Sequence, residues 1–200
     1  MTSEFAVYAR LGFGHIADLS AHDHILFVVA LAAGYGLTHW RHLLVLVTAF
    51  TVGHSVTLAL ATLRLISISS ALVEVLIPVT ILVTALFDVF EVRDGEAEAD
   101  LSPRAQRTKY GLALVFGLIH GLGFSSFLRA LLGAEERITV PLFAFNVGLE
   151  VGQILILAAI LAVTHAVTRW IGMRARLWTF ILSGVVSLAA LVLLAGRLPV

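Results

Sequence analysis

Long apolar runs dominate this sequence. Six mostly apolar segments follow one another along the chain, at residues 24–38, 43–63, 72–90, 110–132, 140–168 and 177–195. An α-helix needs about 20 such residues to cross the hydrocarbon core of a bilayer. Only 13% of the residues are charged, whereas soluble domains carry about 25%. The sequence therefore predicts an all-α integral membrane protein, a single transmembrane domain over residues 1–200 built as a bundle of about six transmembrane helices.

One long polar segment, residues 91–109, separates the third apolar run from the fourth and is predicted to be a solvated loop. Of the 13 Lys and Arg residues, eight lie on the side of this loop and five on the side of the termini. The positive-inside rule then places the loop in the cytoplasm and both termini outside, in a multi-pass protein of the inner or plasma membrane. The net charge of zero gives no indication of nucleic-acid binding.

The N-terminal segment has a helical pattern of its own. Apolar or small side chains share one helical face at Phe5, Tyr8, Gly12, Ile16 and Leu19. This spacing predicts a short helix at the membrane interface that leads into the first span. For the first ten residues the alternative is a frayed tail.

The stretch GHIADLSAHDHILF places three histidines and two aspartates directly before an apolar run. If it is helical, His15 and His22 share one face, whereas Asp23 and His24 point elsewhere. The chain has no cysteine, so histidine and carboxylate are the ligand types available to a metal. A helix or a turn could gather an outer metal-binding group here, and the alternative is a polar cap on the first span.

Three of the apolar runs carry one strongly polar residue near the middle: His54, His120 and Glu150. A charged side chain at mid-bilayer costs about 2.5–3.5 kcal/mol even on insertion scales, so such residues usually face the bundle interior and are functional. Imidazole and carboxylate without thiolate suit nickel, cobalt, zinc, iron or copper. The sequence therefore predicts a midplane metal site made by these three residues. Its expected supporting polar residues are Ser55, Asn146 and Gln153.

Asp88 and Glu91 lie on one helical stripe at the predicted cytoplasmic end of the third run. Two carboxylates in this position could form an exit for a cation. The alternative is a span end that reaches into the lipid headgroups.

Several of these motifs, in this order, resemble the HupE/UreJ family of small membrane proteins, and its second branch in particular. The matching pieces are HI…DHILF, VTAFTVGHSVTLALA, VEVLIPVTI, FGLIHGLGFSSFL and FNVGLEVGQ, between residues 12 and 155. The family is associated with hydrogenase and urease and is regarded as a group of nickel permeases. The resemblance implies functional roles for His15, Asp23, His24, His54, His120 and Glu150.

One departure from the family concerns its first motif. Seven residues separate His15 from Asp23, more than the family's spacing, and the glycine often found in that interval is missing. His22 is therefore an alternative to His15 as the partner of the Asp23–His24 pair.

The sequence is most consistent with a divalent transition-metal permease of the nickel type, in which an outer His/Asp group leads to a midplane His/Glu site. No nucleotide-binding motif is present, so a membrane potential, a proton gradient or a partner would supply the energy. An intramembrane metal-dependent hydrolase and a metal-binding assembly subunit are the alternatives. The expected partners are the lipid bilayer and the metal ion, with a second copy of the chain and a metalloenzyme maturation protein as further candidates.

Overall fold

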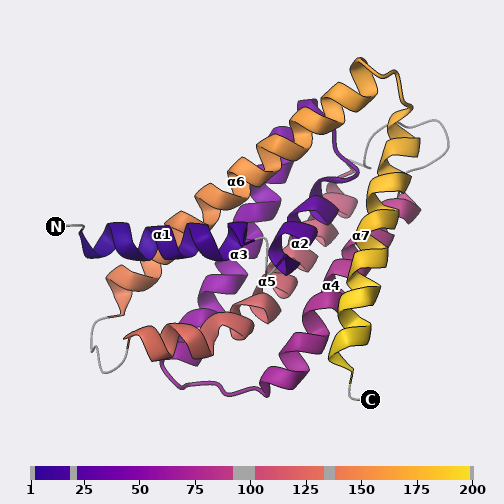
Figure 1. Ribbon diagram of the computed structural model, residues 1–200. Coiled ribbons are helices and arrows are strands. Elements are labelled where there is room, and N and C mark those ends of the chain that lie inside the picture. Colours follow the sequence, from indigo (N-terminus) through magenta and orange to yellow (C-terminus); the bar gives the residue numbers. More distant parts are fainter. Residues whose placement is uncertain (1–2, 19–21, 92–101, 133–137, 199–200) are drawn as a thin grey trace.

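The computed structural model describes residues 3–18, 22–91, 102–132 and 138–198, and over these residues the chain is all-helical (Figure 1). The helices are α1 (Glu4–Ala17), α2 (Asp23–Ala32), the 3₁₀ turn η1 (Leu37–His39), α3 (Trp40–Thr62), α4 (Ser70–Glu91), α5 (Pro103–Leu132), α6 (Thr139–Arg169) and α7 (Ala175–Arg197). Helices suit a bilayer because they satisfy every backbone hydrogen bond within one segment.

Five of these helices, α3 to α7, are long and apolar enough to cross a membrane. They coincide with the second to sixth apolar runs, so these five predicted spans are confirmed as candidates. The helix α5 begins earlier than predicted because Ser102 caps it, accepting a hydrogen bond from the Ala105 amide at 3.3 Å. Pro103 then occupies the first helical position, where its missing N–H costs nothing. The polar segment between α4 and α5 is correspondingly shorter than the predicted loop 91–109.

The first predicted span, residues 24–38, is not one long helix. The helix α2 has 10 residues and ends at Ala32, so at 1.5 Å per residue it is about 15 Å long, half of the hydrocarbon core. Gly34 and Gly36 follow directly and favour the turn that separates α2 from η1. The structure thus differs from the predicted six spanning helices: the residues that it describes contain five long candidates and one short apolar helix.

The N-terminal residues form α1, which Ser3 caps by accepting a hydrogen bond from the Ala6 amide at 3.3 Å. This helix packs tightly on the first half of α6 (Figure 1). A Cβ atom on Gly12 would collide with the carbonyl of Phe145, and one on Gly148 would collide with the carbonyl of Ala9. Glycines on both helices are therefore what allows the two backbones to touch.

The segments α1 and α2 follow α6 in succession. Phe5 lies near Phe143 at a ring separation of 6.3 Å, and Gly152 contacts Ile16. Further along, Val29 of α2 lines the same cavity as Ile160. The helices α1 and α2 thus lie one after the other beside α6 and run in the same direction along it. The helix α1 ends at Ala17, and α2 begins at Asp23.

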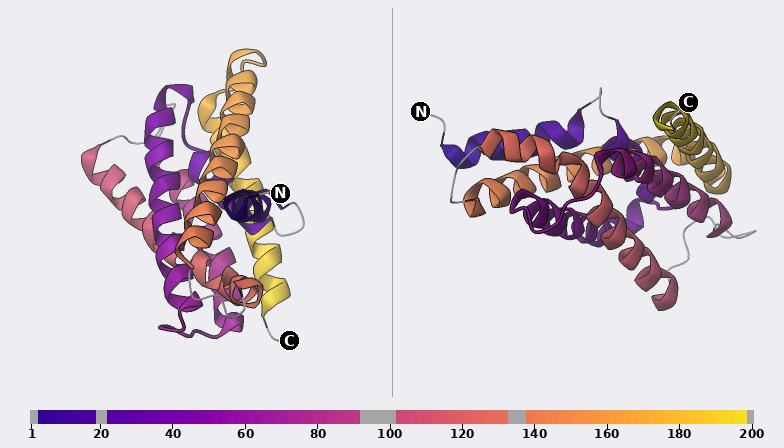
Figure 2. Two further views of the ribbon diagram at one scale, coloured as in Figure 1. Left: turned by 90° about the vertical axis from the view of Figure 1, so that its left-hand side faces the viewer. Right: turned by 90° about the horizontal axis from the view of Figure 1, so that it is seen from below.

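The helices α3 and α5 run parallel and in close contact. Phe50 meets Gly117, and four residues further on His54 meets Gly121, again through backbone carbonyls that a Cβ would strike. Figure 2 shows the two helices side by side from two further directions. This contact places the middle of α3 directly against the middle of α5.

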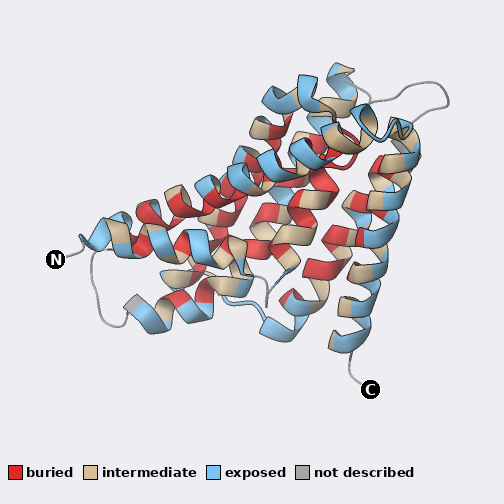
Figure 3. Cartoon of the chain, turned by 45° about the horizontal axis from the view of Figure 1, so that its top comes forward, coloured by how far each residue is buried: buried red, intermediate tan, exposed pale blue. Residues whose placement is uncertain are grey.

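Burial follows the pattern expected for a bundle in lipid. Figure 3 shows buried residues along the inner faces of the helices and exposed ones along their outer faces. Many exposed side chains are large and apolar, among them Val151, Leu155, Leu188 and Val192. Such a surface suits contact with lipid chains rather than with water.

Candidate metal centre

Three histidines from three helices meet inside the bundle. Each of His15, His24 and His54 offers one ring nitrogen, and these nitrogens all lie within 4.8 Å of one another. His15 lies near the end of α1, His24 is the second residue of α2, and His54 lies in the middle of α3. Three imidazoles at this spacing could hold a transition-metal ion. We call these three residues the histidine triad.

The triad lies at the break between α1 and α2. The rings of His15 and His24 are 4.5 Å apart, and the ring of His54 is 6.0 Å from the first and 6.1 Å from the second. The helix α1 packs on α6, and α2 packs among α4, α6 and α7. His15, near the end of α1, and His24, at the start of α2, therefore meet where one helix ends and the next begins. The third member comes from a distant part of the chain.

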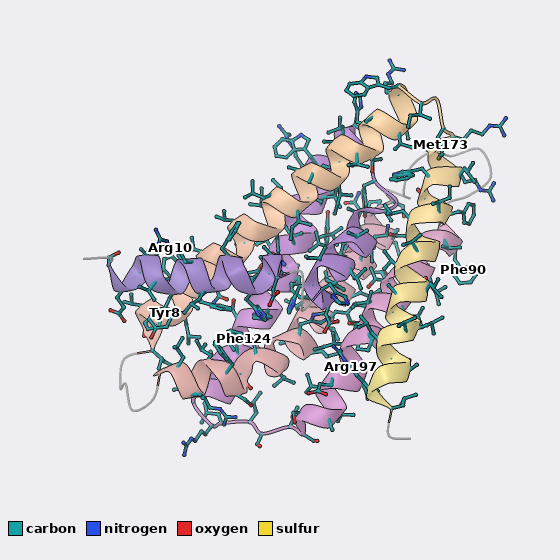
Figure 4. All side chains as sticks on the ribbon, in the orientation of Figure 1. Tyr8, Arg10, Phe90, Phe124, Met173 and Arg197 are labelled. Atoms are coloured by element: carbon teal, nitrogen blue, oxygen red, sulfur yellow. The ribbon has the colours of Figure 1, made fainter. Side chains whose placement is uncertain are left out.

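The surroundings of the triad are apolar and aromatic. Phe124 lies 4.0 Å from the His15 ring, and Phe145 stacks parallel to the His54 ring at 6.3 Å. Figure 4 shows Phe124 below the end of α1, on the side of α5 that faces the bundle. In such a setting an imidazole nitrogen has few hydrogen-bond partners to compete with a metal.

The ring nitrogens of the triad are available for a ligand. His15 Nε2, His24 Nε2 and both nitrogens of His54 are buried and have no hydrogen-bond partner among the described residues. A buried polar atom without a partner typically costs about 1–3 kcal/mol. A bound cation would satisfy one nitrogen of each ring, so the residues present fit a metal.

His120 of α5 lies beside the triad. Its ring is 5.2 Å from that of His24, and its Nε2 lies 2.9 Å from Thr80 Oγ1. Thr80 Oγ1 also donates to the carbonyl of Ile77 at 2.7 Å, so its oxygen can accept from His120 Nε2 when that nitrogen carries the ring proton. In that tautomer the buried His120 Nδ1, which has no hydrogen-bond partner among the described residues, is an acceptor. His120 lies outside the group of nitrogens that are within 4.8 Å of one another, so it is a neighbour of the triad and not a member of it.

Thr80 was not among the residues predicted for the site. The available signal was its spacing: Thr80, Thr84 and Asp88 follow at every fourth position of α4 and share one face. A hydroxyl in a span usually bonds to its own helix, which is why Thr80 did not stand out until α5 was placed against it.

Asp23 is adjacent to His24 but is directed toward the C-terminal end of α7. Its Oδ2 accepts a hydrogen bond from Arg197 Nη2 at 2.7 Å. The other arm of Arg197 donates to the carbonyl of Glu74 at 3.0 Å. That carbonyl needs an outside donor because Pro78, four residues later in α4, has no N–H. Arg197, labelled in Figure 4, thus ties α2, α4 and α7 together below the triad.

Glu150 is not part of the triad in this structure. It accepts a hydrogen bond from Thr48 Oγ1 at 2.6 Å, and one turn further on Gln153 accepts one from Thr51 at 2.7 Å. These pairs form a polar contact between α3 and α6. The distance along α6 explains the separation: Phe145 faces His54, whereas Glu150 is more than a turn beyond it.

The remaining predicted residues occupy separate positions. His22 is the N-cap residue of α2 and is exposed, so of the two alternatives it is His15 that lies beside His24. Ser55 donates to the Thr51 carbonyl at 2.6 Å, and Asn146 Oδ1 is buried. Asp88 is buried against Lys109. Glu91 is the last residue of α4, and its side chain lies outside the part of the chain that the structure describes.

Comparison with known proteins identifies one family. The model of the family described as HupE / UreJ protein matches residues 1–196, nearly the whole chain. No curated protein and no solved structure matches the chain.

Proposed function

The chain belongs to the HupE/UreJ family, which is associated with nickel and metal transport, and we propose that it is a permease for a divalent transition-metal ion. The observation that carries this proposal is the histidine triad, in which three ligand nitrogens lie within 4.8 Å of one another. The ion is the substrate, and nickel is the first candidate, followed by cobalt, zinc, iron and copper.

The character of the ligands supports passage rather than permanent binding. All three are imidazoles, and the nearest carboxylate along the chain, Asp23, is engaged by Arg197. The three imidazole ligands are neutral, so they would not balance the positive charge of an ion bound in the triad. A transport site must bind well enough to collect the ion and weakly enough to release it.

The position of the triad supports transport as well. We infer that α1 and α2 together make one discontinuous crossing, because they accompany α6 from Phe143 to Thr164, about 32 Å at 1.5 Å per residue. Transporters commonly bind ions where a crossing helix is interrupted near the midplane. This arrangement would make six crossings and leave both termini on the side opposite the long loop, which the positive-inside rule places outside.

The route we propose begins at the triad. The ring of His120 lies 5.2 Å from that of His24 and would take the ion next, while Thr80 holds this ring in place. From Thr80 the polar stripe of α4 continues through Thr84 to Asp88. This proposal joins the outer and midplane groups of the sequence-based hypothesis into one central site with a path along α4.

A hydrolytic metal site is the second candidate, because three histidines with an open fourth position are also the ligand set of catalytic zinc. The two functions differ in what happens to the ion. A permease moves it across a sealed membrane, whereas a hydrolase or an assembly subunit retains it.

The test is uptake of ⁶³Ni²⁺ or Co²⁺ into sealed proteoliposomes. We expect wild-type protein to accumulate the ion, His54→Ala to lose uptake, and the exposed His22→Ala to keep it. Equal uptake by wild type and His54→Ala, or binding by wild type without any flux, would contradict the proposal.

A further inference from the structure

The sequence contains a single lysine, Lys109, and the structure buries it. Its Nζ lies 3.3 Å from Asp88 Oδ1, and the two side chains are 6% and 4% exposed. Lys109 is on α5 and Asp88 on α4, within the segments that could cross a membrane. The ammonium also lies over the ring of Tyr35 at 4.6 Å. The other 12 residues among the 13 Lys and Arg are arginines.

A buried ion pair of this kind needs a reason beyond stability. Taking two charges out of water costs several kcal/mol per ion, and apolar residues of similar size often stabilise a fold as well or better. The helices α4 and α5 have ample apolar surface with which to pack. The ion pair is therefore better explained by a function of the Asp88 carboxylate that requires a positive charge beside it.

Lysine suits a replaceable partner better than arginine does. Its ammonium is a compact point charge at the end of a flexible stem, whereas the guanidinium of arginine locks onto carboxylates through two parallel bonds. The hydrogen bond from Lys109 Nζ to Asp88 Oδ1 is 3.3 Å long. It is longer than the 2.7 Å contact between Arg197 and Asp23.

A small cavity adjoins the pair. Its volume is about 20 Å³, and Thr84, Asp88 and Lys109 line it together with apolar residues that include Phe116. A space of about 10–15 Å³ holds one water-sized occupant. The cavity thus offers room for one small ion, with a carboxylate and a hydroxyl on its wall.

The pair is connected to the histidine cluster by one face of α4. Thr80 holds His120, Thr84 donates to the Thr80 carbonyl at 2.8 Å, and Asp88 follows one turn later. Polar groups on this face of α4 therefore continue from Thr80, which contacts His120, to the cavity at Asp88. An ion that leaves His120 along α4 would meet Asp88.

We propose that Asp88 is a second, inner site for the divalent cation, and that the Lys109 ammonium occupies this site whenever the cation is absent. The inference rests on the proposed function for the direction of the path, but the site itself is a separate binding site. Lys109 keeps the buried carboxylate compensated between ions, and an arriving ion displaces the ammonium toward the end of α5. The cation and the ammonium thus compete for one carboxylate.

The experiment counts bound Ni²⁺ per chain by equilibrium dialysis and mass spectrometry of the detergent-purified protein. We expect Lys109→Met to bind a second Ni²⁺ at free concentrations at which wild type, whose ammonium competes for Asp88, binds only the triad ion, and Asp88→Asn combined with Lys109→Met to lose that additional ion. Arg107→Met, an exposed cation on the same helix, should leave the wild-type count unchanged. The same count in Lys109→Met and wild type at every free Ni²⁺ concentration would overturn the proposal.

A further variant separates this inference from the proposed function. His54→Ala combined with Lys109→Met should lose the triad ion and keep the Asp88 ion. If His54→Ala alone leaves binding and uptake intact, the triad proposal fails, whereas the additional ion in Lys109→Met still supports the inner site.

A measurement on the wild-type protein covers the case in which Lys109→Met does not fold. Because Lys109 is the sole lysine, amine modification can be followed at one peptide. Saturating Ni²⁺ should increase its rate of modification and Mg²⁺ should not. No change with Ni²⁺ would show that the ammonium stays on Asp88, contrary to the proposal.

Discussion

The imidazole rings of His15 and His24 lie 4.5 Å apart at an interplanar angle of 65°, although the first belongs to the end of α1 and the second to the start of α2. Both helices contact α6, but α2 also packs on α4 and α7, so a shift of α1 along α6 changes the distance between two ligands. The geometry of the site is therefore coupled to the packing of α1.

Alanine substitutions in the triad should reduce metal affinity. Even the outer partners of a metal ligand are worth about 10–100-fold in affinity, so loss of His15, His24 or His54 should cost more than about 100-fold. Isothermal titration of the purified protein with Ni²⁺ or Co²⁺ measures this loss. His22→Ala is the matched control, because His22 is exposed and lies outside the triad. A loss with His22→Ala as large as that with His15→Ala would argue against the assignment.

Thr80→Val should weaken binding by about 10–100-fold, because the hydroxyl that fixes the His120 ring is removed while the shape is kept. Thr80→Ser retains the hydroxyl and should restore affinity. The same titration measures both variants. If valine and serine behave alike, the hydrogen bond to His120 has no part in binding.

The contact between α1 and α6 can be opened without touching a ligand. Leucine at Gly12 would strike the backbone of Phe145, which cannot move aside as a side chain can. We expect Gly12→Leu to shift α1, to withdraw His15 and to reduce Ni²⁺ affinity, at a stability cost of about 1–3 kcal/mol.

The control for this substitution lies two residues away. A Cβ on Gly14 meets nothing within 4 Å, so Gly14→Leu should bind Ni²⁺ like wild type. Circular dichroism would verify that both variants retain their helices. Normal affinity in Gly12→Leu would show that α1 does not position His15.

Arg197→Met should lower thermal stability, because it leaves the Asp23 carboxylate and the Glu74 carbonyl without their donor. Loss of a hydrogen bond to a charged group typically costs about 1.5–3 kcal/mol. Lysine at position 197 can reach one of the two acceptors but not both, so the melting temperature of Arg197→Lys should lie between those of wild type and Arg197→Met. A melting temperature unchanged in Arg197→Met would show that this link does not hold α2, α4 and α7 together.

Glu150→Gln tests a residue that the structure separates from the triad. Gln retains an oxygen that can accept the Thr48 hydroxyl, so Ni²⁺ affinity measured by titration should change little. A loss as large as that of a triad variant would show that Glu150 reaches the ion in another conformation.

Several parts of the fold could be predicted because they depend on local properties. The five long spans follow from long apolar runs. In a bilayer such a run forms a helix, because a helix satisfies the backbone hydrogen bonds within one segment. The membrane class and the choice of histidine as the ligand type also follow from composition, since the chain has no cysteine.

The first predicted span shows the limit of this reasoning. Residues 24–38 are mostly apolar, but this pattern does not show where the helix must end for the chain to turn. The structure ends α2 at Ala32, and the contacts of α2 with α4, α6 and α7 hold it as a short segment. Hydropathy measures the free energy of transfer from water into lipid. A short apolar helix that is buried among other helices has a hydropathy similar to that of a spanning helix, so hydropathy cannot distinguish the two.

The amino-acid sequence by itself determined the five long helices, the ligand types and the residues His15, His24, His54 and His120 as candidates, because these depend on hydropathy, spacing and the chemistry of single side chains. Only the tertiary structure decided which candidates meet. It joined His15 and His24 across a helix break to His54, directed Glu150 to Thr48, and placed Lys109 on Asp88. These outcomes depend on which helix faces touch, and here that is set by glycine contacts between α1 and α6 and between α3 and α5. The four-residue spacing of such glycines, as in Gly117 and Gly121, predicts a close helix contact, but it does not say which helix makes that contact.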